Sequence, residues 1–166
     1  MSERRATLVA ISAFALNFSC HVPAWAQIQI SCTQRLYVGE HDACGNGFIT
    51  VNPDGSIGST NGCRVTTTPP QGGKCVLSTG GAPVTRNVVV KFATPSIFIN
   101  AGGQKAQVNT LRMDHSTAAT PAATFTFTPT QVSNTVTLDI GGRLNFSTSQ
   151  AIGTYTGQIT IDANLQ

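Results

Sequence analysis

The sequence is poor in charged side chains, with only 10 Lys and Arg and 7 Asp and Glu among 166 residues. The net charge of +3 excludes an electrostatic nucleic-acid binder, which would need Lys and Arg clustered on one face. Intrinsic disorder is excluded as well, because 40% of the residues are apolar and the net charge is low. The composition therefore indicates a globular core.

Long hydrophobic runs and helical periodicity are also missing. The best apolar stretch, residues 6–18, is shorter than the roughly 18 to 20 residues that a membrane-spanning helix needs. After residue 27, no stretch keeps apolar residues at helical spacing for three turns. We therefore expect minor helices or none, and no membrane span in the mature form.

The N-terminus has the pattern of a secretory signal peptide. Arg4 and Arg5 precede the apolar stretch, and Ala24-Trp25-Ala26 has the small-x-small pattern that signal peptidase reads. Removing 26 residues would leave 140 residues, the size of one domain. We predict a signal peptide over residues 1–26, a single domain over residues 27–166, and a location in the periplasm, on the cell surface or outside the cell.

The number and positions of the cysteines give the strongest structural prediction from the sequence. Of five cysteines, Cys20 would leave with the signal peptide, and the even number that remains predicts two disulfides in an oxidising compartment. A hairpin around Pro53-Asp54 would place Cys44 opposite Cys63 and leave Cys32 to bond Cys75. The sequential alternative joins Cys32 to Cys44 and Cys63 to Cys75, and spacing alone does not choose between the two patterns.

Alternation of apolar and polar residues recurs along the chain and predicts antiparallel strands with one buried face. The clearest run is the last, where Tyr155, Ile159, Ile161 and Leu165 share one face. We expect this strand to be central to the sandwich, to face the core through these residues, and to take part in any assembly. Similar runs occur at Val88–Phe92, Phe125–Phe127, Val136–Ile140 and Leu144–Phe146.

Short turn signals separate these runs, as expected for a sandwich or barrel of many short strands. They occur at Asn52–Gly55, Pro69–Gly73, Gly80–Pro83, Ala101–Gly103 and Gly141-Gly142.

Three motifs that resemble chemical sites are better explained as structure. Asn52-Pro53-Asp54-Gly55 is expected to be a type I turn, because a calcium loop would need further carboxylates nearby. His41-Asp42-Ala43-Cys44 lacks a second pair of metal ligands. Asp114-His115-Ser116 is expected at a strand end, where neighbouring side chains point to opposite faces and form no catalytic relay. We therefore expect no catalytic residues, no bound metal and no cofactor.

Three segments carry a resemblance to a known family. They are residues 50–56 (TVNPDGS), 140–146 (IGGRLNF) and 150–157 (QAIGTYTG). Together they resemble a bacterial secreted family catalogued as domain of unknown function 4402, over about Leu36 to Gln166. The resemblance implies a pilin-type β-sandwich, similar in pattern to spore-coat-U and fimbrial subunits, without catalytic activity. In such pilins a cysteine on the first strand bonds one about forty residues later, which implies the pair Cys32 and Cys75 and favours the nested pattern.

The sequence thus predicts an all-β protein, a single antiparallel Ig-like or pilin-like sandwich with disulfides. We expect a non-enzymatic structural or surface-interaction protein of the pilin-like assembly type, with other subunits or a periplasmic chaperone as partners and no nucleic acid. The alternative is a self-contained binding module, adhesin-like or ligand-binding. Only Gln27–Ser31 would precede Cys32 in the mature chain, which favours this alternative because pilin donor segments are longer.

Overall fold

The protein is described by a computed structural model that covers residues 28–39, 46–62, 68–101, 103–116, 120–147, 155 and 157–166. Within these ranges the chain forms strands and one short helix, which confirms the all-β prediction. The strands are β1 (Gln29–Gln34), β2 (Gly47–Val51), β3 (Ile57–Asn61), β4 (Gly73–Ser78), β5 (Val88–Phe92), β6 (Ile97–Ala101), β7 (Gln104–Asp114), β8 (Thr124–Phe127), β9 (Val136–Phe146) and β10 (Ile161–Leu165), and the helix is α1 (Pro129–Val132).

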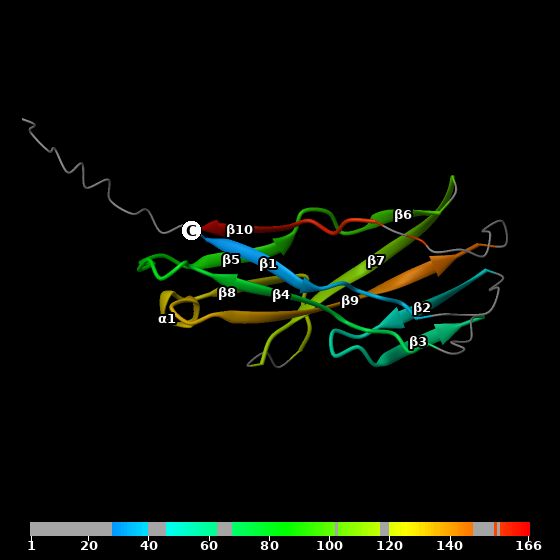
Figure 1. The fold of residues 1–166 in the computed structure, drawn as a ribbon, viewed down its shortest axis with the longest axis horizontal. Helices are drawn as coiled ribbons and strands as arrows, with labels where there is room; N and C mark the ends of the chain where they lie inside the picture. Colours follow the sequence, from blue (N-terminus) through cyan, green and yellow to red (C-terminus); the bar gives the residue numbers. More distant parts are fainter. Residues whose placement is uncertain are drawn as a thin grey trace, which may run out of the picture.

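The strands form two sheets, and every described strand pair is antiparallel. The larger sheet has the order β1-β4-β9-β2-β3, with β7 also paired to β9 and β6 paired to β7. The smaller sheet has the order β10-β5-β8. Figure 1 shows the strands running roughly along the long axis of the molecule, and the two sheets make the expected antiparallel sandwich.

The long strand β9 organises the larger sheet. Its first half pairs with β4 and its second half with β2, whereas β7 pairs with residues 139–145 across both halves. Since a strand has two edges, β4 and β2 follow one another along one edge and β7 occupies the other. One strand therefore links the two ends of the molecule.

The core lies between the sheets and follows the predicted alternation. In β5, Val88, Val90 and Phe92 are buried, and in β9 the buried side chains are those of Leu138, Ile140, Leu144 and Phe146. The intervening residues are partly or fully exposed, except Gly141 and Gly142. Branched and aromatic side chains fill these inward positions because they pack well on a pleated surface.

The helix α1 is a single turn between β8 and β9. Pro129 begins it, and the Gln131 side chain accepts a hydrogen bond from the Thr128 amide at 2.8 Å. Proline suits a first helical turn because its missing N–H would have no partner there. In the described part of the chain, no helix has the length and apolarity to cross a membrane.

A disulfide joins Cys32 on β1 to Cys75 on β4, 43 residues later. The two cysteines are opposite one another in the β1–β4 register. This bond confirms the first pair of the nested pattern and excludes the sequential one. Cys44 and Cys63 lie outside the described residues, so their bond to one another stays a prediction. They flank the β2–β3 hairpin in sequence, as that prediction requires.

The predicted turn at Gly141-Gly142 is wrong, because both glycines lie inside the continuous strand β9. These glycines are needed for close packing. A Cβ atom on Gly141 would collide with the Val51 carbonyl oxygen and approach the Pro53 nitrogen to 2.7 Å, and one on Gly142 would lie 3.1 Å from the Leu111 side chain. A glycine pair therefore marks a close approach of backbones here, and not a reversal of the chain.

Replacing Gly141 with alanine is expected to lower the free energy of unfolding by about 1 to 3 kcal/mol, the usual cost of overpacking. The new methyl group would meet backbone atoms of β2 and the following turn, which cannot move without disturbing the β2–β9 ladder. The matched control is Gly58→Ala on the exposed strand β3, where the atoms nearest to the methyl group belong to the Asn52 side chain and not to the backbone. Urea denaturation of both variants checks this, and equal stabilities would contradict it.

Candidate functional site

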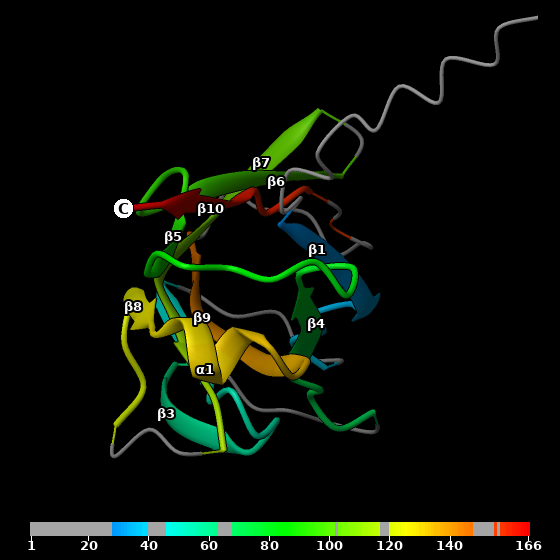
Figure 2. The same ribbon diagram turned by 90° about the vertical axis from the view of Figure 1, so that its left-hand side faces the viewer.

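The edge formed by β1 and β10 is the candidate functional site. Strand β10 pairs only with β5, and β1 pairs only with β4, so each is an edge strand of its sheet in the described part of the chain. The two strands are in contact with one another although they belong to different sheets. Figure 1 shows them along the same border of the sandwich, and Figure 2 shows the same two strands in a view turned by 90°.

The opposite border of the sandwich is closed by backbone hydrogen bonds. Met113 on β7 and Ala122, two residues before β8, form an antiparallel bridge with N–H to carbonyl distances of 2.7 and 2.9 Å. This bridge links the larger sheet to the chain that enters the smaller sheet. No equivalent bridge joins β1 to β10 among the described residues, so the sandwich is asymmetric.

The hydrogen-bond register shows which amides of β10 face its open edge. Ala93 donates to the Thr160 carbonyl at 3.0 Å, and Gln166 donates to the Asn87 carbonyl at 2.8 Å. Both pairs continue the β10–β5 register. Because hydrogen-bonded pairs alternate along an antiparallel ladder, Asp162 and Asn164 bond β5, whereas the amides of Ile161, Ala163 and Leu165 point away from it.

Apolar side chains along this edge are incompletely covered. Ile161, Ala163 and Leu165 lie opposite Phe92, Val90 and Val88, the inward-facing residues of β5. Val88 and Val90 have no exposed surface, whereas Leu165 is 38% exposed. Ile161 and Ala163 are only partly buried, as are Ile28, which precedes β1, and Ile30 on β1. Both edge strands therefore carry apolar side chains that pack against the core and keep some exposed surface.

The predicted position of the C-terminal strand needs correction, because β10 lies at the edge of the smaller sheet and is not central. The strand begins at Ile161, so Tyr155 and Ile159 precede it. Tyr155, Ile159 and Ile161 do pack against the core, each partly buried, but Leu165 is exposed. The alternation of apolar and polar residues identified the inward face correctly. It carried no information on whether β10 pairs with another strand on each of its two edges.

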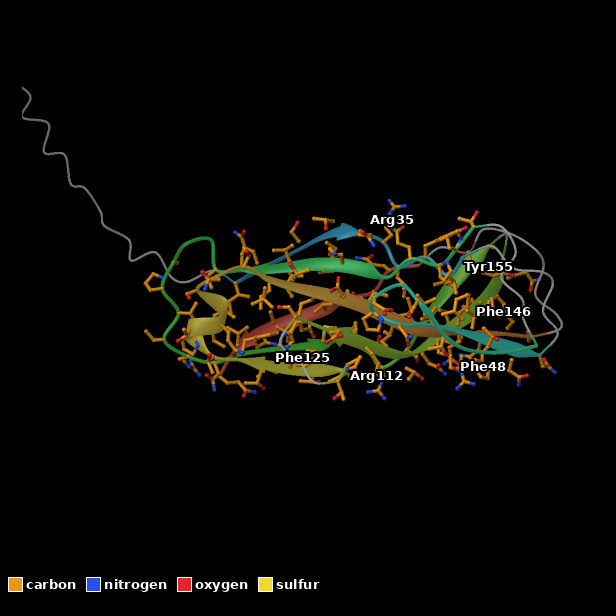
Figure 3. The ribbon with its side chains drawn as sticks, turned by 90° about the horizontal axis from the view of Figure 1, so that it is seen from below. Arg35, Phe48, Arg112, Phe125, Phe146 and Tyr155 are labelled. Atoms are coloured by element: carbon orange, nitrogen blue, oxygen red, sulfur yellow. A yellow bond between two sulfur atoms is a disulfide. The ribbon has the colours of Figure 1, made fainter. Side chains whose placement is uncertain are left out.

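The segment before β10 packs closely on β6. A Cβ atom on Gly157 would lie 2.5 Å from the Ile99 side chain and 3.1 Å from the Phe98 carbonyl oxygen. Only glycine allows this approach, which explains the glycine before the alternating run. In Figure 3, Tyr155 and Phe146 lie toward the same end of the molecule as Phe48, away from Phe125 on β8.

The other candidate motifs have structural positions or lie outside the described residues. His115 follows the end of β7, as predicted, and its ring packs edge-on against Phe125 and Phe127 at 4.6 and 5.0 Å between ring centroids. Residues 41–44 are outside the described ranges. Among the described residues, no group of three or more His, Cys, Asp or Glu side chains is placed to hold a metal ion.

A comparison with known protein families shows to which family the chain belongs. A family model described as "Domain of unknown function (DUF4402)" matches residues 28–165. The chain belongs to this family. No curated protein and no solved structure matches the chain.

Two of the segments that resemble DUF4402 meet in the structure. Residues 50–56 comprise the last two residues of β2 and the turn after it, where Gly55 donates to the Asn52 carbonyl at 2.9 Å and has φ 85°. Residues 140–146 belong to β9, and Gly141 is the residue that lets this turn approach β9. The predicted turn is confirmed, and the two DUF4402 segments form one packing unit.

Further residues of the DUF4402 segments stabilise the same region. The guanidinium of Arg143 lies 3.4 Å from the centroid of the Phe48 ring on the neighbouring strand β2. Such a cation–π contact contributes about 0.5 to 1 kcal/mol at an exposed site. Leu144 and Phe146 point into the core. These contacts of residues 143–146 thus help to hold β2 on β9.

Proposed function

We propose that this DUF4402 protein is an exported, non-enzymatic assembly subunit. Its β1–β10 edge accepts an extended segment from a partner subunit, which adds a strand beside β10. The single observation that supports this function most is the open edge of β10, where three amides face outward beside incompletely buried apolar side chains.

Adding a strand at this edge is expected to be favourable, because it would satisfy backbone groups and bury apolar side chains. The incoming backbone would bond the amides of Ile161, Ala163 and Leu165, and its alternate side chains would cover the core between the two sheets. Edge strands of self-contained proteins usually carry lysine, proline or a bulge that prevents such pairing. The sequence of β10 has none of these and a single charged residue, Asp162. The edge is therefore receptive to another strand.

The added strand is proposed to come from another subunit, and a periplasmic chaperone is the proposed partner before assembly. The chain's own first strand is already used, because β1 pairs with β4 and is bonded to it through Cys32 and Cys75. In the proposed mature form only Gln27–Ser31 precede Cys32. Such a short segment would make this chain an acceptor of strands more than a donor.

The proposal is tested by substituting Ala163 on β10 with proline. The Ala163 amide points to the open edge, so its loss leaves the bonds from β10 to β5 in place, whereas an added strand would lose a hydrogen bond and meet the proline ring. Ala163→Val is the matched control, because valine keeps the amide and favours strands. Size-exclusion chromatography with light scattering measures the material exported by producing cells.

We expect the wild-type chain and Ala163→Val to be found in complexes of higher mass, and Ala163→Pro to be found as a monomer. Circular dichroism should give the same strand content for all three proteins. Complexes of unchanged mass in the Ala163→Pro variant would refute strand addition at β10. A folded wild-type monomer that never enters a complex would favour the self-contained binding module.

A further inference from the structure

A polar pocket of about 330 Å³ lies on the outer face of the larger sheet, beside the turn at residues 52–56. Its floor is made by Gln34, Lys74 and Asp139, which are directly opposite one another on the adjacent strands β1, β4 and β9. Asp54 on the turn and Gln71 before β4 also line it. The pocket volume is at the lower end of the range for small-molecule sites.

The turn beside the pocket is held rigidly. The amide and hydroxyl of Ser56 donate to Asp54 Oδ1 at 2.9 and 2.6 Å. These hydrogen bonds, that of the hydroxyl above all, lower the pKa of Asp54, so its carboxylate is ionised at neutral pH. Gly72 allows the turn to lie against the chain entering β4, because a Cβ atom there would collide with the Pro53 carbonyl oxygen.

The floor of the pocket is ordered by two polar contacts. Gln34 Nε2 donates to the Gly72 carbonyl at 2.6 Å, and Lys74 Nζ lies 3.5 Å from Asp139 Oδ1. Neither contact uses the whole hydrogen-bonding capacity of its side chains, since an amide also accepts and an ammonium carries three donors. The described residues give Asp54 Oδ2 no hydrogen-bond partner either. The pocket thus offers fixed acceptors and donors together.

The charges of the side chains that line the pocket restrict which class of ligand can bind there. Two carboxylates against one ammonium would repel a phosphate group, and a divalent cation would lack ligands because two carboxylates are too few. An apolar ligand would leave the charged groups without water or partners. A neutral molecule rich in hydroxyl groups satisfies all of them, since each hydroxyl both donates and accepts.

An aromatic residue, Tyr37, pairs through its backbone with Gln71, one of the residues that line the pocket. Tyr37 and Gln71 bond each other in both directions at 2.8 Å, which makes them a directly opposed antiparallel pair. Side chains of such a pair lie on the same face, so the tyrosine ring is on the Gln71 side. Tyr37 is 37% exposed.

We propose that this pocket binds a neutral saccharide unit, with the Asp54 and Asp139 carboxylates accepting from its hydroxyls and Lys74 donating to them. The site shares Gln34 on β1 with the border that contains the assembly edge, but it contains no residue of β10, where the added strand would bind. A subunit of this kind would display a sugar-binding site on each copy in an assembly.

Saturation-transfer NMR on the full mature chain tests this site with free glucose, galactose, mannose, fucose and N-acetylglucosamine, and with methyl phosphate, whose C–H protons the experiment detects, as a charged comparison. At least one sugar should bind with a Kd in the millimolar range, about −4 kcal/mol, and methyl phosphate should not. Asp54→Asn and Asp139→Asn should each weaken binding about tenfold or more, because each removes a charged acceptor. Asn can still accept from Ser56, so the turn is kept.

Asp162→Asn on β10 is the matched control, with the same change of charge in the other sheet, and it should bind the sugar as the wild type does. Absence of saturation transfer from all five sugars would overturn the proposal. Equal affinity in the wild type and both pocket variants would overturn it as well. Neither result bears on strand addition, which the Ala163 variants test separately.

Discussion

A strand joined to the C-terminus of the chain is expected to raise its melting temperature by about 10 to 20 °C. Gln166 lies beside the open edge, because it directly follows Leu165, the last residue of β10. A flexible turn followed by a strand with valine at alternate positions can therefore fold back along β10. It would bond the outward amides and cover Ile161, Ala163 and Leu165, with up to about 1 kcal/mol gained for each of these partly exposed side chains.

The same extension with serine in place of valine is the control for this experiment. It can form the same backbone hydrogen bonds but covers little of the core, so it should raise the melting temperature by only a few degrees. Differential scanning calorimetry of the three proteins measures the effect. Equal melting temperatures for the wild type and the valine extension would mean that the core between β1 and β10 needs no further strand.

Loss of the Cys32–Cys75 bond is expected to lower the free energy of unfolding by about 4 kcal/mol, the loop-entropy value for a closed loop of 43 residues. The bond keeps β1 on β4, and β1 is an edge strand with no other strand partner in the described part of the chain. Chemical denaturation of Cys32→Ala/Cys75→Ala should show this loss. A decrease of less than about 1 kcal/mol would contradict the expected role of the bond.

Reduction provides an independent check on this prediction. In a background with alanine at positions 44 and 63, Cys32–Cys75 is the bridge that dithiothreitol would break. The reduced protein and the Cys32→Ala/Cys75→Ala protein should then be equally stable in that background. If the reduced protein is clearly more stable than the Cys32→Ala/Cys75→Ala protein, part of the stability that the double substitution removes comes from the packing of the Cys75 side chain, which is buried.

Much of the fold could be predicted because it depends on local patterns. Alternating residues identified β5, β8 and β9 and their inward faces. The turn at Asn52–Gly55 was predicted from proline and glycine, whose backbone preferences are intrinsic. The Cys32–Cys75 pair was implied by the resemblance to pilins and not by spacing, because spacing leaves several pairings open.

The errors arose where one residue pattern serves two physical purposes. Glycine marks turns through its free backbone, but at Gly141 it marks a close approach to β2 and the following turn. Alternation marks a buried face, but β10 alternates equally well at an edge as it would in the middle of a sheet. Only the strand order shows that β10 has one neighbouring strand among the described residues.

The polar pocket could not have been predicted from the sequence. Gln34, Lys74 and Asp139 are widely separated along the chain, and they meet only through the registers of β1 with β4 and of β4 with β9. The Asn52–Gly55 turn gave a partial signal, because it was noted as a candidate oxygen-rich loop. Its chemistry depends on neighbours that the sequence does not place beside it.

Amide hydrogen exchange along β10, measured by NMR for the isolated chain and for complexes from producing cells, tests strand addition most directly. In the isolated chain, the amides of Ile161, Ala163 and Leu165 should exchange about 100-fold faster than those of Asp162 and Asn164, which bond β5. In the complexes all five should be equally protected. Outward amides that are already protected in the isolated chain, or that stay unprotected in the complexes, would contradict the account.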